Sequence, residues 1–379
     1  MTAQPVSAPL LKDQINATLV RQIGHSCVRH YPQFPLEMFC QQTLNETFAQ
    51  RELKARIRWV ATQIYLHLAL PFASACQVLK PVSTEFSGLA GFIFGDIVEQ
   101  FGLDDAATAL DALAHFTCYS TSEFAIRPFL TRYPELTLGQ MQQWARSDNH
   151  HLRRLASEGS RPRLPWGQAL PQYKQDPTPL LPILELLRQD DSDYVRRSVA
   201  NHLNDISKDQ PDLALAICQR WYGSHPYTNW IVKHALRGLL KQRHAAALAI
   251  FDYQPADLTL DLTLTSTELQ LGDTLQFQLK LRQASGLTQK IRLEYAIDFA
   301  GKQGQPRHKV FQWLERLISE PELQLKRSYV FKDLTTRKHY AGEHQLHIIV
   351  NGQILQSMRF QLRAEPSMLA FNRSYTQSH

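Results

Sequence analysis

The spacing of apolar residues changes near Asp252, and this change constrains the fold more than any other feature of the sequence. Upstream, apolar residues recur at helical spacing in segments separated by short breaks that contain Pro or Gly. Downstream, the stretch LTLDLTLTSTELQLGDTLQFQLKLR alternates apolar and polar residues, and four further strand-like runs follow it. The sequence therefore predicts a multidomain chain: an all-α region over residues 1–254, an all-β immunoglobulin-like sandwich over 255–364 and a flexible tail over 365–379.

Composition sets broad limits on the class of protein. The chain has 379 residues, 44% of them hydrophobic, which is enough for two or three domains with a sizeable core. Its five cysteines are scattered without a C-x-x-C pair, a pattern that fits reduced thiols better than disulfides or a zinc site. The sequence shows no secretory signal and no apolar run long enough to span a bilayer. We therefore expect a monomeric cytoplasmic protein that does not contact membranes.

The helical region contains a repeat. YVRRSVANHLNDI aligns with WIVKHALRGLLKQ when Val195 is matched to Val232, which lies 37 positions later. HLRRLASEG, which begins at His151, resembles the same helix. Repeats of two or three helices at roughly 40 residues are typical of HEAT-type solenoids, whose stacked helices present one extended binding surface. We therefore expect an all-α solenoid of HEAT-like repeats.

One helix of this repeat, with Asp193 as its predicted N-cap, carries a polar stripe opposite its apolar side. Asn and Asp lower helix propensity, so a merely solvated surface would favour Glu, Lys and Gln. Arg, Asn and Lys donate hydrogen bonds to phosphate oxygens, and the formal charge of +6 also favours a polyanion partner, although weakly. The alternative is a solvated surface with chance clustering. The stripe and its neighbouring repeats contribute Arg154, Arg197, Asn201, Asn204, Asp205, Lys208, Lys233, Arg237 and Lys241.

Two acids do not fit a purely basic groove. Asp205 lies within the polar stripe, where a carboxylate repels phosphates, unless it only pairs with a neighbouring cation such as Lys208. Glu158 ends a helix just before Gly159, a predicted C-cap, where negative charge opposes the helix dipole. The next segment, SRPRLPW, contains two prolines that predict an extended path carrying Arg161, Arg163 and Trp166.

Three segments strongly resemble the AlkC/AlkD group of HEAT-like-repeat DNA glycosylases, and the AlkC branch in particular. They are RRLASEGSRPRLPW, YVRRSVANHLNDISKDQPD and WIVKHALRGLLK, within about residues 119–243. Some AlkC members also carry an immunoglobulin-like C-terminal domain. The resemblance implies an enzyme that excises cationic alkylated bases, such as 3-methyladenine and 3-methylcytosine, from double-stranded DNA. Functional positions of the family fall on Glu123, Glu158, Trp166 and Asp205, with Arg154 as a DNA contact.

The implied chemistry suits these residue types. A cationic base is already a good leaving group, so the remaining tasks are to stabilise an oxocarbenium-like sugar and to position a water molecule. We assign Glu158 and Asp205 to these tasks, place Glu123 near the lesion and expect Trp166 to contact the lesion or its sugar. The expected DNA contacts are Arg154, Arg161, Arg163, Arg197, Asn201, Lys233 and Arg237.

No cofactor and no metal are expected, because the sequence shows no zinc-ligand pattern, P-loop or dinucleotide motif. The fifteen histidines show no metal-ligand spacing along the chain. The alternative function is a non-catalytic HEAT scaffold that binds DNA or a protein through the same surface. Such a binder has no use for acids at Glu158 and Asp205. A second DNA-binding surface is expected on cations predicted to lie in loops of the sandwich, namely Lys302, Arg307, Lys309, Arg337 and Lys338.

Overall fold

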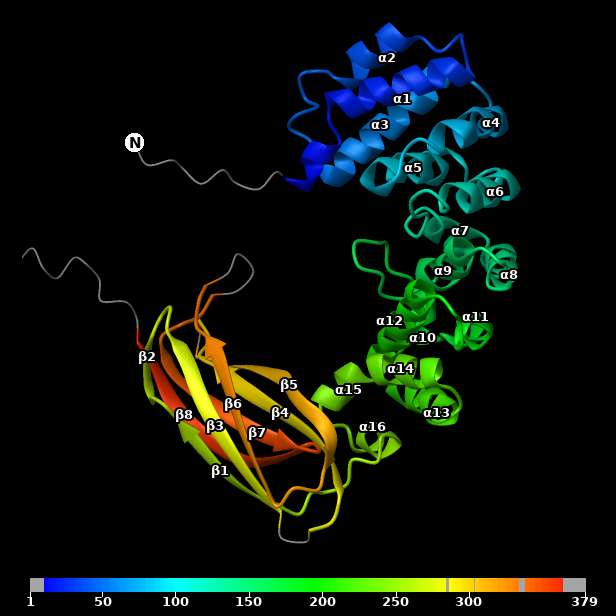
Figure 1. Cartoon of the computed structure of the whole chain (residues 1–379). Coiled ribbons are helices and arrows are strands. Elements are labelled where there is room, and N and C mark those ends of the chain that lie inside the picture. The colour runs from blue at the N-terminus through cyan, green and yellow to red at the C-terminus, as the bar shows by residue number, and fades with distance from the viewer. Residues whose placement is uncertain (1–9, 284–285, 303, 334–337, 364–379) are drawn as a thin grey trace, which may run out of the picture. The chain divides into compact units, whose positions relative to one another are not determined.

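A computed structural model describes residues 10–283, 286–302, 304–333 and 338–363, so the predicted tail over 365–379 lies outside the described residues. The chain divides into two compact units, and the boundary falls between Leu236 and Arg237. The first unit is helical and the second is mainly β-structure (Figure 1). The predicted order, an all-α region followed by an all-β domain, is confirmed. Among the described residues, no helix combines the length and the apolar character that crossing a membrane requires.

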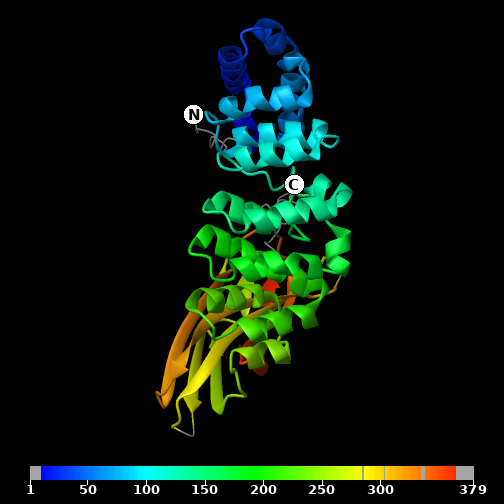
Figure 2. The same cartoon turned by 90° about the vertical axis from the view of Figure 1, so that its right-hand side faces the viewer.

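The helices of the first unit stack in two layers (Figures 1 and 2). Within the first layer, α3 packs on α5, and α12 packs on both α9 and α14. This layer consists of α3 (Leu53–Leu68), α5 (Phe92–Phe101), α9 (His150–Gly159), α12 (Asp193–Asp209) and α14 (Pro226–Ala235). The second layer consists of α4 (Phe72–Ser83), α6 (Ala106–Phe116), α8 (Pro134–Trp144), α11 (Leu181–Leu187) and α13 (Pro211–Trp221). The remaining elements are η1 (Leu11–Gln14), α1 (Ala17–His30), α2 (Leu36–Thr43), η2 (Gly88–Gly91), α7 (Arg127–Arg132), α10 (Pro171–Gln175) and η3 (Thr178–Leu180).

Helix α12 is covered on more than its apolar side. The predicted apolar stripe is buried, as expected, and consists of Val195, Val199, Leu203 and Ile206. The N-cap is Ser192 rather than Asp193, which is the first helical residue. Asn204 and Asp205, predicted to lie on an open polar stripe, are only 5% and 1% exposed. The reason is that α12 packs against both α9 and α14, so part of the stripe forms helix–helix contacts.

The helix predicted for the next repeat after α12 is broken into two. We predicted one helix over WIVKHALRGLLK, but α14 ends at Ala235 and a separate short helix, α15 (Arg237–Lys241), follows. Leu236 has a ψ of 4°, outside the α-helical range, and Gly238, a poor helix former, follows two positions later. The predicted basic stripe therefore does not run along a single helix, because Lys233 lies on α14 while Arg237 and Lys241 lie on α15.

The second unit begins with α15 and α16 (Ala245–Ile250) and continues as two β-sheets (Figure 1). The strand orders are β1-β3-β6 and β2-β8-β7-β4-β5. All pairs are antiparallel except β2–β8, and side chains of both sheets form one apolar core. The strands are β1 (Leu258–Leu264), β2 (Glu268–Gln270), β3 (Thr274–Gln283), β4 (Gln289–Phe299), β5 (Arg307–Ile318), β6 (Glu322–Val330), β7 (Gly342–Val350) and β8 (Gln353–Arg363).

Strand β5 was not predicted. It is the edge strand of the larger sheet, and a register shift in its pairing with β4 breaks the alternation of buried and exposed residues. Arg307 and Lys309, predicted as loop cations, therefore lie within a strand. Lys302 and Lys338 lie outside the strands, as predicted, and Arg337 lies outside the described residues.

Asn204 joins two helices of the first layer. Its Nδ2 donates to the carbonyl of Ala235 at 2.7 Å, and Ala235 is the last residue of α14. Carbonyl groups at a helix C-terminus lack partners within the helix, so this side chain satisfies one of them. We predict that Asn204→Ala lowers the free energy of unfolding by about 1–3 kcal/mol, the usual penalty for a buried carbonyl without a partner. Chemical denaturation followed by helical circular dichroism measures this change.

Arg197→Ala on the same helix is the control, because it removes an exposed ion pair to Asp193. It should cost no more than about 1 kcal/mol. Equal losses of unfolding free energy in the two variants would show that the Asn204 hydrogen bond stabilises the packing of α12 on α14 no more than an exposed ion pair does.

Candidate active site

Arg161 links carboxylates from two neighbouring helices of the first layer. Its Nη1 lies 2.7 Å from Glu158 Oε1 on α9, and its Nε lies 2.9 Å from Asp205 Oδ2 on α12. The side chain of Arg161 is 8% exposed, that of Glu158 9% and that of Asp205 2%. Charges removed from water need a close partner, so each member of this group depends on the others. Lys208 adds a contact of 3.2 Å to the second oxygen of Asp205.

A second arginine extends this network to Glu123. Arg154 Nη2 lies 2.6 Å from Glu123 Oε2 and 3.7 Å from Glu158 Oε1. Its Nη1 donates to Thr121 Oγ1 at 3.0 Å, and its guanidinium lies 4.7 Å from the ring centroid of Tyr194. The structure therefore brings the three predicted acids into one ionic network with Arg154 and Arg161. Thr121 and Tyr194 were not singled out from the sequence, although an aromatic residue in the first turn of α12 was a usable signal.

The C-terminal end of α9 differs from the prediction in two ways. The charge of Glu158, which we expected to oppose the helix dipole, is compensated, because Arg161 and Arg154 both contact it. Gly159 is the last helical residue and Ser160 is the C-cap. A Cβ atom at Gly159 would lie 2.6 Å from a methyl group of Ile126, so close packing, rather than a left-handed cap, requires glycine here.

The segment after α9 forms turns instead of the predicted extended path. Arg163 forms a two-pronged ion pair with Asp209, with contacts of 2.7 and 2.5 Å. The backbone N–H of Gly167 donates to the carbonyl of Leu164 at 3.1 Å, which closes a turn around Pro165 and Trp166. Trp166 has a φ of 65° and is 65% exposed. Because proline holds its neighbour in a compact turn here, the indole is presented to solvent.

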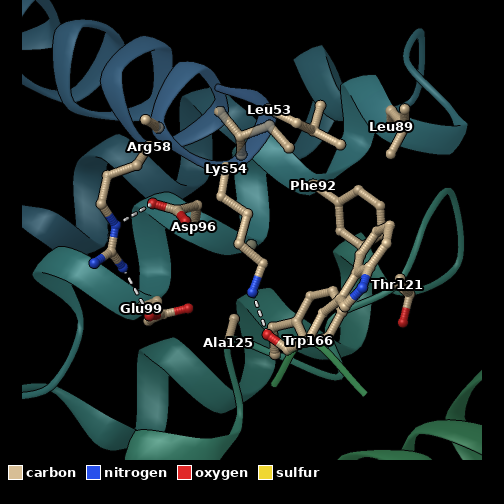
Figure 3. A pocket seen from close by; sticks show the side chains of 14 residues that line it. Leu53, Lys54, Arg58, Leu89, Phe92, Asp96, Glu99, Thr121, Ala125 and Trp166 are labelled. Atoms are coloured by element: carbon tan, nitrogen blue, oxygen red, sulfur yellow. Dashed lines mark hydrogen bonds and ion pairs between the residues drawn. The ribbon is translucent and has the colours of Figure 1, made fainter. Parts of the chain in front are cut away.

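Trp166 also lines a pocket of about 310 Å³ between α3, α5 and the residues before α7. Figure 3 shows Arg58 facing Asp96 and Glu99 at one end of the pocket, and Trp166 with Phe92 at the other. Lys54 reaches across from α3 and donates to the carbonyl of Trp166. Burial raises the pKa of the Asp96 and Glu99 carboxyl groups, while Arg58 opposes this shift.

The other expected DNA contacts lie outside the carboxylate network or at its margin. Arg197 is exposed, and its Nε lies 2.6 Å from Asp193 Oδ2. Arg163 is likewise paired with an aspartate, Asp209. Asn201 is partly buried, with its Oδ1 3.2 Å from a ring nitrogen of His234. Lys233 and Arg237 are partly buried, on α14 and α15 respectively.

Two buried groups lie behind the acids, and neither was identified from the sequence. Arg127 is fully buried and donates from Nη1 to the carbonyl of Gly159 at 2.9 Å. Burial, together with the charge of Arg161, lowers its pKa to about 10. His202 of α12 is also fully buried, and its Nδ1 lies 2.9 Å from the carbonyl of Ser157. Burial lowers the pKa of His202 to about 3, so this ring is neutral at physiological pH and donates to Ser157.

The neutral state of His202 predicts acid sensitivity. The folded-state pKa lies below the unfolded value of 6.5, so the unfolded chain binds the extra proton and stability is lost as the pH falls below 6.5. At about pH 5 the loss attributable to this residue is about 2 kcal/mol. His202→Asn keeps a donor near the position of Nδ1 and removes the titration. We expect the variant to lose less stability than the wild type between about pH 7 and 5, measured by denaturant unfolding; parallel losses would contradict this assignment.

Comparison with known proteins identifies the family. The family described as DNA alkylation repair enzyme matches residues 55–239, and the family described as the C-terminal Ig-like domain of the uncharacterised protein YhaZ matches residues 259–364. The chain is 45% identical over 355 residues to the uncharacterized protein YhaZ of Bacillus subtilis (strain 168), covering 93% of this chain and 99% of that protein. It is 35% identical, with a TM-score of 0.90, to the alkylpurine DNA glycosylase AlkC of Pseudomonas fluorescens bound to DNA containing an abasic site analog, covering 94% of this chain and 100% of that one. The chain therefore belongs to the AlkC/AlkD-type family of DNA alkylation repair enzymes and carries a YhaZ-type C-terminal Ig-like domain.

Proposed function

We propose that this protein is a DNA glycosylase that hydrolyses the N-glycosidic bond of cationic alkylated bases, including 3-methyladenine and 3-methylcytosine, in double-stranded DNA. The observation that carries this proposal is the gathering of Glu123, Glu158 and Asp205, from the segment before α7, α9 and α12, around two arginines. Membership of a DNA alkylation repair family and similarity to a glycosylase solved with DNA support the class of reaction.

The reaction needs negative charge near the sugar. As the bond between C1′ and the alkylated base breaks, the base leaves neutral and the positive charge moves to the sugar. Glu158 and Asp205 stabilise this cation, and one of them accepts a proton from the water molecule whose oxygen adds to C1′. Glu123 lies nearest the lesion, where its negative charge stabilises the cationic base. Trp166 contacts the lesion or its sugar through its exposed indole face.

Arg161 has a different role from the one expected from sequence. We expected it to contact DNA, but its side chain is buried and hydrogen-bonded to both Glu158 and Asp205. A phosphate contact would require breaking these pairs, so we propose that Arg161 positions the two carboxylates. Arg154 does the same for Glu123 and retains a partly exposed edge for DNA. The remaining contacts proposed for DNA are Arg163, Arg197, Asn201, Lys233 and Arg237.

Glu158→Gln and Asp205→Asn should each reduce the single-turnover excision rate by about 100-fold or more, because each removes negative charge that stabilises the transition state. DNA affinity should be equal or higher, since a carboxylate repels phosphates. Excision is measured on methylated DNA by chromatography of the released base, and affinity by fluorescence anisotropy. Glu185→Gln, which alters an ion-paired glutamate on α11 of the other layer, is the matched control and should retain the wild-type rate. A near-normal rate in either site variant would remove that residue from the catalytic assignment.

The double variant Lys233→Ala/Arg237→Ala should weaken binding to damaged and undamaged duplexes alike. The slope of the logarithm of affinity against the logarithm of salt concentration should become shallower by about one unit for each phosphate that the variant no longer neutralises. Arg220→Ala, which removes an exposed arginine of α13 in the second layer, is the control and should leave the slope unchanged. An unchanged slope in the double variant would place Lys233 and Arg237 outside the DNA interface.

The direct test of the function is incubation of the full-length protein with methylated duplex DNA in the presence of a chelator. Release of free 3-methyladenine and 3-methylcytosine supports the proposal. Binding of the duplex without release of either base would instead support the alternative of a non-catalytic scaffold.

A further inference from the structure

Three potential metal ligands meet on the outer face of the larger sheet. Asp298, His308 and His347 come from the adjacent strands β4, β5 and β7. Asp298 lies between the core residues Ile297 and Phe299, and successive residues of a strand point to opposite faces, so Asp298 points away from the core. By the same reasoning His347, between two core residues of β7, points outward. One ligand atom from each of the three lies within 4.8 Å of the others.

We propose that Asp298, His308 and His347 bind a divalent transition-metal ion of the Zn²⁺ class. Two imidazole nitrogens and one carboxylate oxygen form an established ligand set for Zn²⁺, with a water molecule in the fourth position. His308 Nδ1 lies 2.6 Å from Asp298 Oδ1, and His347 Nε2 lies 2.9 Å from Asp298 Oδ2. Ligand atoms around a tetrahedral Zn²⁺ lie about 3.3 Å apart, given metal–ligand bonds of about 2.0–2.2 Å. Each histidine therefore needs to move away from the carboxylate by about 0.4–0.7 Å, and the two histidine nitrogens, which lie within 4.8 Å of each other, need to reach a similar spacing to hold the ion.

A hydrogen bond outside the ligand set orients His347. Its Nδ1 lies 2.7 Å from Ser357 Oγ, and the two residues face each other in the pairing of β7 with β8. This contact holds the ring with Nε2 directed at Asp298. When an ion takes the lone pair of Nε2, the ring proton moves to Nδ1 and is donated to Ser357, whose hydroxyl also accepts hydrogen bonds. Outer contacts of this kind orient histidine ligands in known metal sites.

The exposure of the three side chains suits entry of an ion. His347 is 10% exposed, Asp298 29% and His308 45%, so a fixed ligand lies beneath two that solvent reaches.

The proposed ion would act on the β-domain. Its ligands tie the edge strand β5 to β4 and β7, so binding should stabilise this sheet against local opening. All three ligands belong to the second compact unit, whereas the proposed catalytic carboxylates belong to the first. The site therefore goes beyond the proposed glycosylase function and is tested without measuring excision.

The experiment is a Zn²⁺ titration of chelator-treated, full-length protein by isothermal titration calorimetry. We expect one ion per chain, micromolar or tighter affinity and a melting temperature several degrees higher with Zn²⁺. Co²⁺ should give the intense visible bands of a four-coordinate ion with nitrogen and oxygen ligands. Asp298→Asn and His308→Ala should each weaken binding at least tenfold, His308→Ala/His347→Gln should abolish it, and Ser357→Ala should weaken it by about tenfold.

The matched control is the neighbouring pair His150 and His151 of α9, whose ring centroids lie 4.3 Å apart. His150→Ala/His151→Ala should retain full stoichiometry and affinity. Circular dichroism checks folding, and the single change at exposed His308 keeps the test decisive if the double variant misfolds. The absence of Zn²⁺ binding in the wild type, or unchanged binding after His308→Ala, would overturn the proposal.

Discussion

The guanidinium of Arg161 lies between carboxylates of α9 and α12, two neighbouring helices of the first layer, and the geometry of the candidate site depends on this buried contact. Removing one partner from a buried ion pair costs about 3–5 kcal/mol, since the remaining charge keeps its desolvation penalty without its compensation. The same network continues through Glu158 to Arg154 and Glu123. The segment before α7 and the helices α9 and α12 are therefore held in register by charge pairing as well as by apolar packing.

The balance of charge in this network bears on a cationic substrate. Glu123, Glu158 and Asp205 contribute three negative charges, against two positive charges from Arg154 and Arg161 and one from buried Arg127, whose charge interacts with all three acids. Lys208 adds a further compensating charge from a largely exposed position, with its ammonium 3.2 Å from Asp205. On the proposed function, a cationic base or an oxocarbenium-like sugar takes over this compensation. A substrate cation displaces an exposed lysine more easily than a buried arginine.

What the sequence predicts well is what depends on neighbours along the chain. The apolar stripe of α12 and the alternating strands follow from local periodicity. Asp205 was singled out because a carboxylate among cations conflicts with its surroundings, Glu158 because it opposes the helix dipole, and Glu123 through the family resemblance. The partners of those acids were not predictable in this way, because Arg161 meets Asp205 only when α9 packs on α12. The helix break at Leu236, edge strand β5 and the meeting of Asp298 with two histidines likewise arise from contacts between distant segments.

Trp166 shows that the candidate site also goes against local backbone preference. A left-handed conformation costs about 1–2 kcal/mol for a residue with a side chain, and this position of the turn favours glycine or asparagine. The chain nevertheless places its exposed indole here, and Lys54 from α3 fixes the carbonyl of the same residue. Backbone strain of this kind persists where the surrounding structure enforces it, and it concentrates at functional sites. A buried carboxylate and a strained, exposed tryptophan thus occur within one short stretch, from Glu158 to Trp166. Each is unfavourable for folding by itself, and together they favour a role in chemistry over a role in packing.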